Sequence, residues 1–234
     1  MCGRVVAASS REYFGDAFDV SETVGEELPP RYNVAPTDAV YAIVDTPSSR
    51  RLGVMQWGLV PSWAPDPDSG PRPINARAET LLDRRQFANA LERRRCIVPV
   101  NGFYEWEKLP DGRRQPYFVV APDGSPMALA GLWDRWVPPD GDALVTCTIV
   151  TTAANTTMAR LHDRMPAILD RGAWSEWLDP TLHDPLHAAS LLHPSPDDAI
   201  ELRAANPRVN NVGNDGPELL EPDPDLGVPL QLPL

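Results

Sequence analysis

The stretch CIVPVNGFYEWE, residues 96–107, carries β-branched and aromatic side chains in short runs that Pro and Gly interrupt. Runs of this kind are typical of β-strands. The same pattern recurs in five other stretches: YAIVDT (41–46), GVMQWGLV (53–60), PYFVVA (116–121), MALAGLWDRWV (127–137) and LVTCTIVTT (144–152). The sequence therefore predicts a core built of short strands.

Four further stretches favour short helices, because apolar residues recur at helical spacing or a capping residue precedes them. They are RAETLLDRRQFANALERRR (77–95), NTTMARLHDRMP (155–166, capped by Asn155 and stopped near Pro166), DRGAWSEWLD (170–179) and DPLHAASLLH (184–193). Helices and strands do not alternate regularly, which argues against a doubly wound sheet. We predict one compact α+β domain over residues 1–222 and a flexible, Pro-rich acidic tail over residues 223–234.

The three cysteines, Cys2, Cys96 and Cys147, are odd in number and lack CxxC spacing. This argues against a disulfide framework and a structural zinc site, and we predict no metal and no cofactor. Cys96 and Cys147 lie in apolar runs and are expected in the core. The amino terminus lacks a secretory signal, and no apolar run approaches the roughly 20 residues of a membrane helix. We therefore predict a cytoplasmic protein.

The net charge of −12 argues against nucleic acid as a partner. The distribution of charge weakens that objection, because seven arginines face only three acidic residues between positions 71 and 95: Arg72, Arg77, Arg84, Arg85, Arg93, Arg94 and Arg95 against Glu79, Asp83 and Glu92. A local basic face can bind phosphates on an acidic protein, since salt limits charge interactions to about 10 Å.

The chain begins MCGRVV, with a cysteine at a position where termini tend to fray. Removal of Met1 would leave Cys2 with a free α-amine and a thiol on adjacent carbons. Such a 1,2-aminothiol condenses with an aldehyde, first to an imine and then to a five-membered thiazolidine ring. The amine has a reference pKa of about 7.7–8.0. The thiol starts near about 8.5, and a nearby His or Arg is expected to lower its pKa.

Seven ordered blocks resemble the SRAP family (SOS response-associated peptidase): MCGR, PRYNVAPT, WGLVPSWA, INARAET, RRCIVPVNGFYEW, LAGLWD and HDRMP, with a weaker continuation through WLDP and VNNVGNDGPELLEP. The resemblance implies a compact domain with a barrel-like core of mostly antiparallel strands flanked by helices. It also implies an abasic-site sensor that crosslinks covalently to single-stranded DNA through a thiazolidine on Cys2, shielding the lesion during the DNA damage response. The family name adds a peptidase activity, which could remove Met1.

The resemblance also implies roles for particular residues. Cys2 would form the crosslink, Asn75 would hold the terminus and the sugar, Glu105 would act as acid and base, and His162 would move protons. The residues expected to contact DNA are Gly3, Arg4, Asn33, Trp63, Arg77, Arg85, Trp106 and Arg164. The expected partner is single-stranded DNA that contains abasic sites, bound by a monomer without a metal and without a membrane.

Three other interpretations stay open at this point. Class II glutamine amidotransferases also begin MCG and use Cys2 as an amino-terminal nucleophile, although INARAET and HDRMP have no role there. Cys2, His162 and Asp163 could form a cysteine-peptidase set directed at Met1. A non-catalytic single-strand-binding module would bind DNA equally well without Cys2.

Overall fold

The computed structural model describes residues 2–223; Met1 and most of the predicted tail lie outside the described residues. Five strands close into a barrel in the order β11-β10-β7-β4-β5, and a parallel pairing of β5 with β11 completes the ring. Shorter strands extend it: β2 pairs with β5, while β6 and β12 pair with β11. The bounds are β2 Glu22–Thr23, β4 Ala39–Asp45, β5 Arg50–Trp57, β6 Asn75–Arg77, β7 Arg95–Val100, β10 Met127–Trp136, β11 Leu144–Ala153 and β12 Arg164–Pro166.

A second, five-stranded antiparallel sheet has the order β13-β9-β8-β1-β3. Its strands are β1 Val5–Ala7, β3 Arg31–Val34, β8 Gly102–Lys108, β9 Arg114–Val120 and β13 Glu201–Ala204. The expected α+β fold with a barrel-like, mostly antiparallel core is confirmed, and solved structures share it as described below.

The stretch 96–107 connects the two sheets, because β7 belongs to the barrel and β8 to the second sheet, with only Asn101 between them. The Asn101 amide oxygen accepts hydrogen bonds from the backbone N–H groups of Ala8 (2.8 Å) and Ser9 (3.1 Å). Gly102 follows, and a β-carbon there would lie 2.5 Å from the Phe118 ring. The corner therefore needs a residue without a side chain, and the Asn101 bonds attach the end of β1 to it.

The helices are shorter than the sequence predicts. They are α1 Arg11–Ala17, α2 Arg85–Arg93, α3 Trp174–Leu178 and α4 Pro185–Ser190. The helix expected over 77–95 is only α2, after a 3-10 turn at Ala78–Thr80, because Asn75–Arg77 pairs with the barrel as β6.

The helix expected over 155–166 is wrong. Asn155 does cap a turn, since its side chain accepts from Met158 N–H at 2.8 Å, but that turn is a 3-10 segment at Met158–Arg160. The residues after it form β12, which pairs with β11. Backbone pairing at the barrel edge thus outweighs the local helical preference.

Arg95 is a buried cation that joins two helix ends. Its guanidinium donates to the carbonyl oxygens of Leu91 (2.8 Å) and Glu92 (2.7 Å) at the end of α2, and of Trp177 (2.6 Å) and Asp179 (2.5 Å) at the end of α3. Only 5% of Arg95 is exposed. The carbonyl ends of helices carry partial negative charge, so one fork of donors satisfies both. Cys96 and Cys147 are fully buried, as expected.

Replacing Arg95 with Lys keeps the charge but loses the planar fork, so carbonyls of two helix ends lose their donors. We expect a loss of about 3 kcal/mol in the free energy of unfolding, since buried bonds to a charged group contribute about 1.5–3 kcal/mol each. Urea unfolding followed by circular dichroism measures it. Arg93→Lys, whose side chain is 62% exposed, is the matched control. Equal stability of the two variants would contradict the role of Arg95.

Candidate functional site

Cys2 is only 1% exposed, so the expectation of a frayed terminus is wrong. The reason is the position of β1, which lies between β8 and β3 inside the second sheet. Val5 pairs with Phe103, and the N–H of Tyr104 donates to the carbonyl of Arg4 at 2.9 Å. The start of the chain is thus as firmly held as the middle of a sheet.

Asn75 holds the main chain of Cys2 from the other sheet. Its side-chain amide donates to the Cys2 carbonyl at 2.7 Å, and its backbone pairs with Ile149 of β11. The amide oxygen of Asn75 is buried and accepts no hydrogen bond within residues 2–223. An unsatisfied buried acceptor beside a candidate nucleophile is an open position for a donor of the substrate.

Burial raises the pKa of the Cys2 thiol far above its ordinary value, and the negative charge of Glu105 raises it further. The backbone N–H of Arg4 acts in the opposite direction but is outweighed. The expected lowering by a His or Arg side chain is therefore wrong for this state of the protein. The thiol is protonated at neutral pH.

Glu105, in β8, is a buried carboxyl with 6% exposure. It follows Tyr104, which is fully buried, and precedes the half-buried Trp106. Both Glu105 and Cys2 are buried, and the charge of the carboxylate contributes to raising the pKa of the Cys2 thiol. A carboxyl in that place can give or take a proton at the atoms of Cys2.

The third group of candidate residues comes from β6, β11 and β12. Arg77 of β6 and Pro166 of β12 both lie opposite Thr151, on the two edges of β11. The ring nitrogen Nδ1 of His162 lies 3.0 Å from the backbone N of Arg164 and 2.7 Å from a carboxyl oxygen of Asp163. A neutral ring accepts from Arg164, whereas a ring protonated at Nδ1 donates to Asp163. The Nδ1 atom of His162 thus has a hydrogen-bond partner whether or not it carries a proton.

Arg164 is held in place by other residues. It forms a two-bond ion pair with Glu79 (2.6 and 2.9 Å) and donates to the Thr151 carbonyl at 2.6 Å. Arg77, by contrast, is exposed, and its side chain makes no hydrogen bond or ion pair with any residue in the range 2–223. Of the two arginines, Arg77 is the one whose guanidinium is available to a phosphate.

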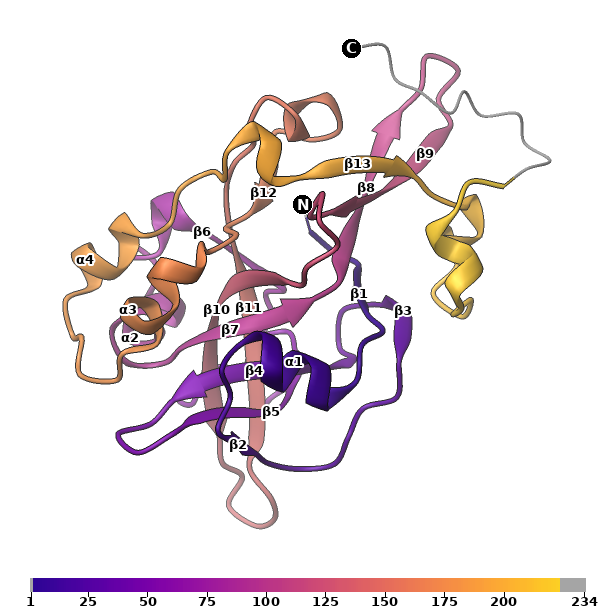
Figure 1. Ribbon diagram of the computed structural model, residues 1–234. Helices are drawn as coiled ribbons and strands as arrows, with labels where there is room; N and C mark the ends of the chain where they lie inside the picture. Colours follow the sequence, from indigo (N-terminus) through magenta and orange to yellow (C-terminus); the bar gives the residue numbers. More distant parts are fainter. Residues whose placement is uncertain (1, 224–234) are drawn as a thin grey trace.

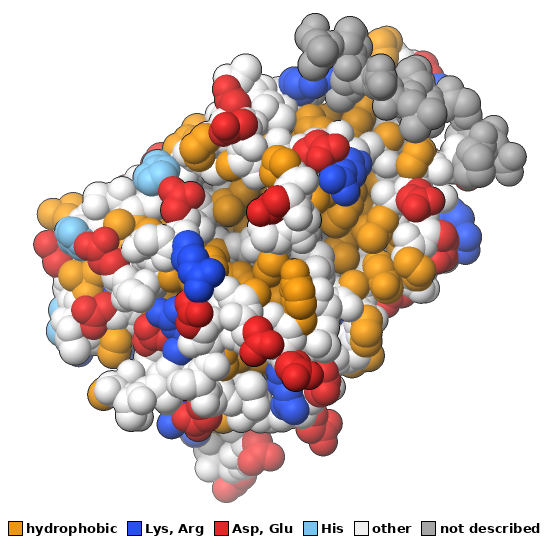
Figure 2. Space-filling model, in the orientation of Figure 1, with side chains coloured by type: hydrophobic (Ala, Val, Ile, Leu, Met, Phe, Trp, Pro, Cys, Tyr) orange, Lys and Arg blue, Asp and Glu red, His pale blue; other side chains and the backbone are white. Residues whose placement is uncertain are grey.

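The run of arginines between positions 71 and 95 does not form one cationic face. Arg72, Arg93 and Arg94 pair with Asp68, Glu92 and Asp134, and Arg95 is buried. On the face in Figure 2, basic side chains likewise stand singly among acidic ones. Within the described chain, Arg77, Arg84 and Arg85 are the members of the run without a carboxylate partner, so the basic signal is narrower than the sequence suggests.

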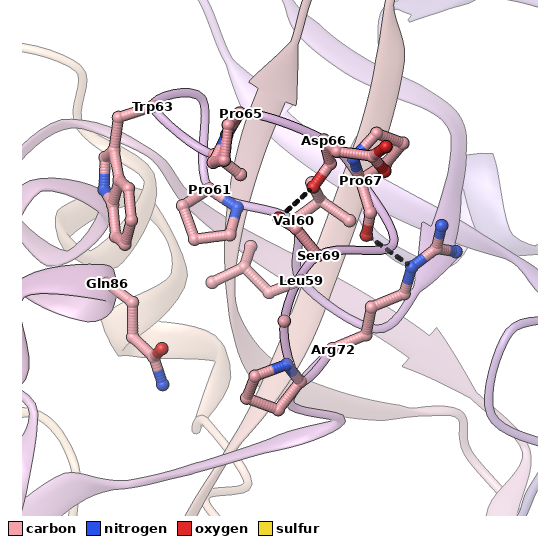
Figure 3. Close-up of a pocket in the computed structure, with 13 residues that line it drawn as sticks. Leu59, Val60, Pro61, Trp63, Pro65, Asp66, Pro67, Ser69, Arg72 and Gln86 are labelled. Carbon is pink, nitrogen blue, oxygen red and sulfur yellow. Dashed lines mark hydrogen bonds between the residues drawn. The ribbon is translucent and has the colours of Figure 1, made fainter.

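Trp63 lines a separate pocket of about 260 Å³ formed largely by the loop between β5 and β6, with Arg72 as the cation among the lining residues (Figure 3). Trp63 is 49% exposed, and the Arg85 guanidinium carbon lies 4.8 Å from the centre of its ring. None of the four predicted catalytic residues lines this pocket. It offers an aromatic face and a cation, a pairing suited to a base and a phosphate.

Asp134 is a residue that the sequence reasoning missed. Its carboxylate is 4% exposed and accepts from the Ser62 N–H (2.8 Å) and from Arg94 (2.7 Å). The Trp136 indole donates to the Ala64 carbonyl at 2.8 Å. These bonds fix the loop that presents Trp63. The sequence signal was a charged residue inside LAGLWD, a block with the pattern of a strand. A charge in such a block is explained by burial together with hydrogen-bond or ion-pair partners.

Asn33 lies where DNA cannot reach it, because it is fully buried. Its amide oxygen accepts from Arg4 at 2.6 Å, and its nitrogen donates to three backbone carbonyls, those of Val209, Asn211 and Asn214. Trp106 lies next to this group, with the Arg4 guanidinium carbon 5.8 Å from the centre of its ring. The predicted DNA-binding residues therefore divide into exposed ones and supporting ones.

Within residues 2–223, no helix has the length and apolar character needed to cross a membrane.

Comparison with known proteins gives consistent results. The sequence profile described as "SOS response associated peptidase (SRAP)" matches residues 1–212. The abasic site processing protein YoqW of Bacillus subtilis is 40% identical over 94% of this chain and 99% of its own length. The abasic site processing protein HMCES of Pongo abelii is 32% identical over 95% of this chain and 76% of its own. A crystal structure from Bacteroides thetaiotaomicron matches with a TM-score of 0.75 and 27% identity, covering 84% of this chain and 87% of that one. The chain described here belongs to the SRAP family.

Proposed function

We propose that this protein processes abasic sites in single-stranded DNA by forming a covalent bond between Cys2 and the lesion. The names of its relatives support the substrate. The single observation that carries the chemistry is the position of Cys2, which is buried, is held by the Asn75 amide and is within the electrostatic influence of the Glu105 carboxylate. We propose that it acts as a monomer. We also propose that it works in the cytoplasm, because its three cysteines are unpaired.

The reaction requires an open aldehyde and a free amine. The closed abasic sugar is in equilibrium with an aldehyde at C1′, and a proton from Glu105 would assist opening. After Met1 is removed, the α-amine of Cys2 adds to C1′ and water leaves, which gives an imine. The Cys2 sulfur then adds to the same carbon, and the nitrogen takes up the proton that the thiol releases. The product is a thiazolidine, and the net loss is one water.

The protonated thiol suits this order of events. Burial disfavours the thiolate in the chain that still carries Met1, and an attack that begins at the amine does not need one. Glu105 would then take the thiol proton as sulfur bonds to the imine carbon, and would pass that proton to the nitrogen. The amine and sulfur belong to one residue, so ring closure is intramolecular and gains effective concentration. An imine alone would permit β-elimination and strand cleavage, whereas the ring prevents both.

The remaining residues hold the substrate. The open acceptor on Asn75 would receive a hydrogen bond from the amine or from a sugar hydroxyl. His162 would relay protons, since its Nδ1 has a partner in both protonation states. Arg77 would bind a phosphate next to the lesion, and Trp63 with Arg85 would bind the strand further along.

Two rivals receive less support. The amidotransferase interpretation leaves INARAET and HDRMP unused, while the family match accounts for both. A glutaminase assay tests it directly. Removal of Met1 by the chain itself is part of our proposal, and the name of the family supports it. Retention of Met1 on a Cys2→Ala variant, but not on the parent protein, is the expected result.

Incubation with an abasic single-stranded oligonucleotide should give an adduct that survives a denaturing gel. Its intact mass should equal protein without Met1 plus DNA minus one water. Cys2→Ala should abolish it, because no sulfur can close the ring. Cys147→Ala is the matched control, a buried cysteine in the barrel core that should leave the adduct intact. Equal adducts from the parent and Cys2→Ala would reject the proposed bond.

Glu105→Gln should slow adduct formation about 10²- to 10⁴-fold at neutral pH, the usual contribution of a positioned acid or base. DNA affinity should stay within about twofold, because the amide keeps the shape of the carboxyl. Single-turnover gel assays at saturating DNA measure the rate. Glu107→Gln, two residues along the same strand and bonded to the Tyr117 hydroxyl, is the control. An unchanged rate for Glu105→Gln would remove Glu105 from the mechanism.

Arg77→Ala should weaken binding to single-stranded DNA and reduce the slope of log affinity against log salt by about 0.7, the value for one phosphate contact. Fluorescence anisotropy across a salt series measures both. Arg171→Ala, which removes an exposed arginine paired with Asp19, should change neither. A slope that stays the same for Arg77→Ala would mean that Arg77 contacts no phosphate.

A further inference from the structure

The block VNNVGNDGPELLEP, residues 209–222, has no part in the chemistry above. The structure places the first half of this block beside the site. We call residues 206–215, which are that half and the three residues before it, the clasp. In Figure 1 the clasp belongs to the gold turns after β13, close to β3. Its end is fixed to β3, because the Asp215 carboxylate accepts from the Tyr32 N–H at 2.6 Å and pairs with Arg31.

Asn33 fixes the middle of the clasp. Its side-chain nitrogen lies within hydrogen-bond distance of the carbonyls of Val209 (3.3 Å), Asn211 (3.1 Å) and Asn214 (2.8 Å). Three carbonyls that converge on one buried amide define the path of the backbone between them. Asn214 adds a bond from its own amide to the Arg208 carbonyl at 2.8 Å. The clasp is therefore a shaped loop with a fixed position on β3.

The clasp in turn sets two residues that we expect to meet DNA. One terminal nitrogen of Arg4, Nη1, donates to the Val209 carbonyl (2.8 Å) and to the Asn33 oxygen (2.6 Å). No described residue bonds the other edge of the guanidinium, Nε and Nη2, which is the edge that takes two oxygens of a phosphate. The Trp106 indole donates to the Asn210 oxygen at 2.7 Å, which orients its ring.

We propose that the clasp forms one wall of the DNA groove, and that Asn33 is a positioning residue which sets this wall and Arg4 together. The occupant is the nucleotide next to the abasic site, with its phosphate on the outer edge of Arg4 and its base against Trp106. The proposal rests on the function proposed above. It assigns Asn33 a role without contact to DNA, as its complete burial requires.

Val212, at the exposed tip of the clasp, gives the most direct test. It is 55% exposed and belongs to no strand or helix. Val137, 54% exposed, follows β10 in the hairpin at the bottom of Figure 1, away from the gold turns that contain the clasp, and it is the matched control. Both positions can take a charge without disturbing the core.

With an abasic single-stranded oligonucleotide, Val212→Lys should lower the half-saturating DNA concentration about threefold and steepen the salt dependence by about 0.7. Val212→Glu should raise the half-saturating concentration by a similar factor. The same changes at Val137 should have less than half of these effects. If the half-saturating DNA concentrations of Val212→Lys and Val212→Glu differ no more than those of Val137→Lys and Val137→Glu, the clasp is not a wall of the groove.

Asn33→Ala tests the positioning role. It should raise the half-saturating DNA concentration about tenfold and leave the maximal crosslinking rate within about twofold, because Cys2, Asn75 and Glu105 keep their contacts. In combination with the position 212 variants, it should also reduce the difference in half-saturating DNA concentration between Val212→Lys and Val212→Glu. A fall in maximal rate with unchanged half-saturation would overturn the positioning role. If Asn33→Ala does not fold, Asn210→Ala, which frees Trp106 from the clasp, should raise half-saturation alone, and an unchanged value overturns the proposal.

Each variant is also measured for binding to the same oligonucleotide with a tetrahydrofuran in place of the abasic sugar, which cannot form an imine. A parent protein that binds this DNA but forms no adduct with the abasic oligonucleotide would reject the covalent mechanism. The comparison of the Val212 and Val137 variants in binding to this DNA would still show whether the clasp forms a wall of the groove.

Discussion

A hydrogen bond from the Asn75 amide to the carbonyl of Cys2 joins the two sheets at the point where the chain begins. Asn75 belongs to a strand on the barrel, and Cys2 leads into the central part of the second sheet. The bond therefore fixes the terminus relative to Thr151 and to Arg164 of β12, which both depend on the barrel. The corner at Asn101 joins the two sheets elsewhere, and the Asn75 bond joins them at the site itself.

Burial and reactivity have to be reconciled at Cys2. The side chain that we propose to react with a sugar is enclosed, and its thiol is harder to ionise than a free cysteine. A thiolate would be the better nucleophile in a single-step attack. A reaction that begins at nitrogen removes this need, because the imine is a strong electrophile held next to the sulfur. The same burial also protects the thiol from oxidation between encounters with DNA.

The strands and the single-domain α+β fold could be predicted from the sequence, because runs such as 96–107 and 144–152 combine β-branched residues with clear boundaries. The helices could be predicted only in part. Three of the four predicted stretches contain α2, α3 and α4, whereas Arg164–Pro166 has a helical neighbourhood in sequence but pairs with the edge of the barrel in space. The four catalytic candidates came from a family resemblance. The raised pKa of the Cys2 thiol did not come from that resemblance, because the desolvation of Cys2 depends on strands far along the chain. The burial of Asn33 and the ion pair of Arg164 with Glu79 are likewise invisible without the fold.

The first strand pairs with residues about a hundred positions away, as Val5 with Phe103 shows. A ribosome adds roughly 5–20 residues per second, so β1 waits on the order of ten seconds before β8 exists. During that interval the start of the chain is accessible to any enzyme that trims nascent proteins. Once the sheet closes, the same peptide bond is next to a residue that is 1% exposed. Synthesis order thus gives the initiator methionine a limited period of easy removal, after which the folded protein itself controls access to that bond.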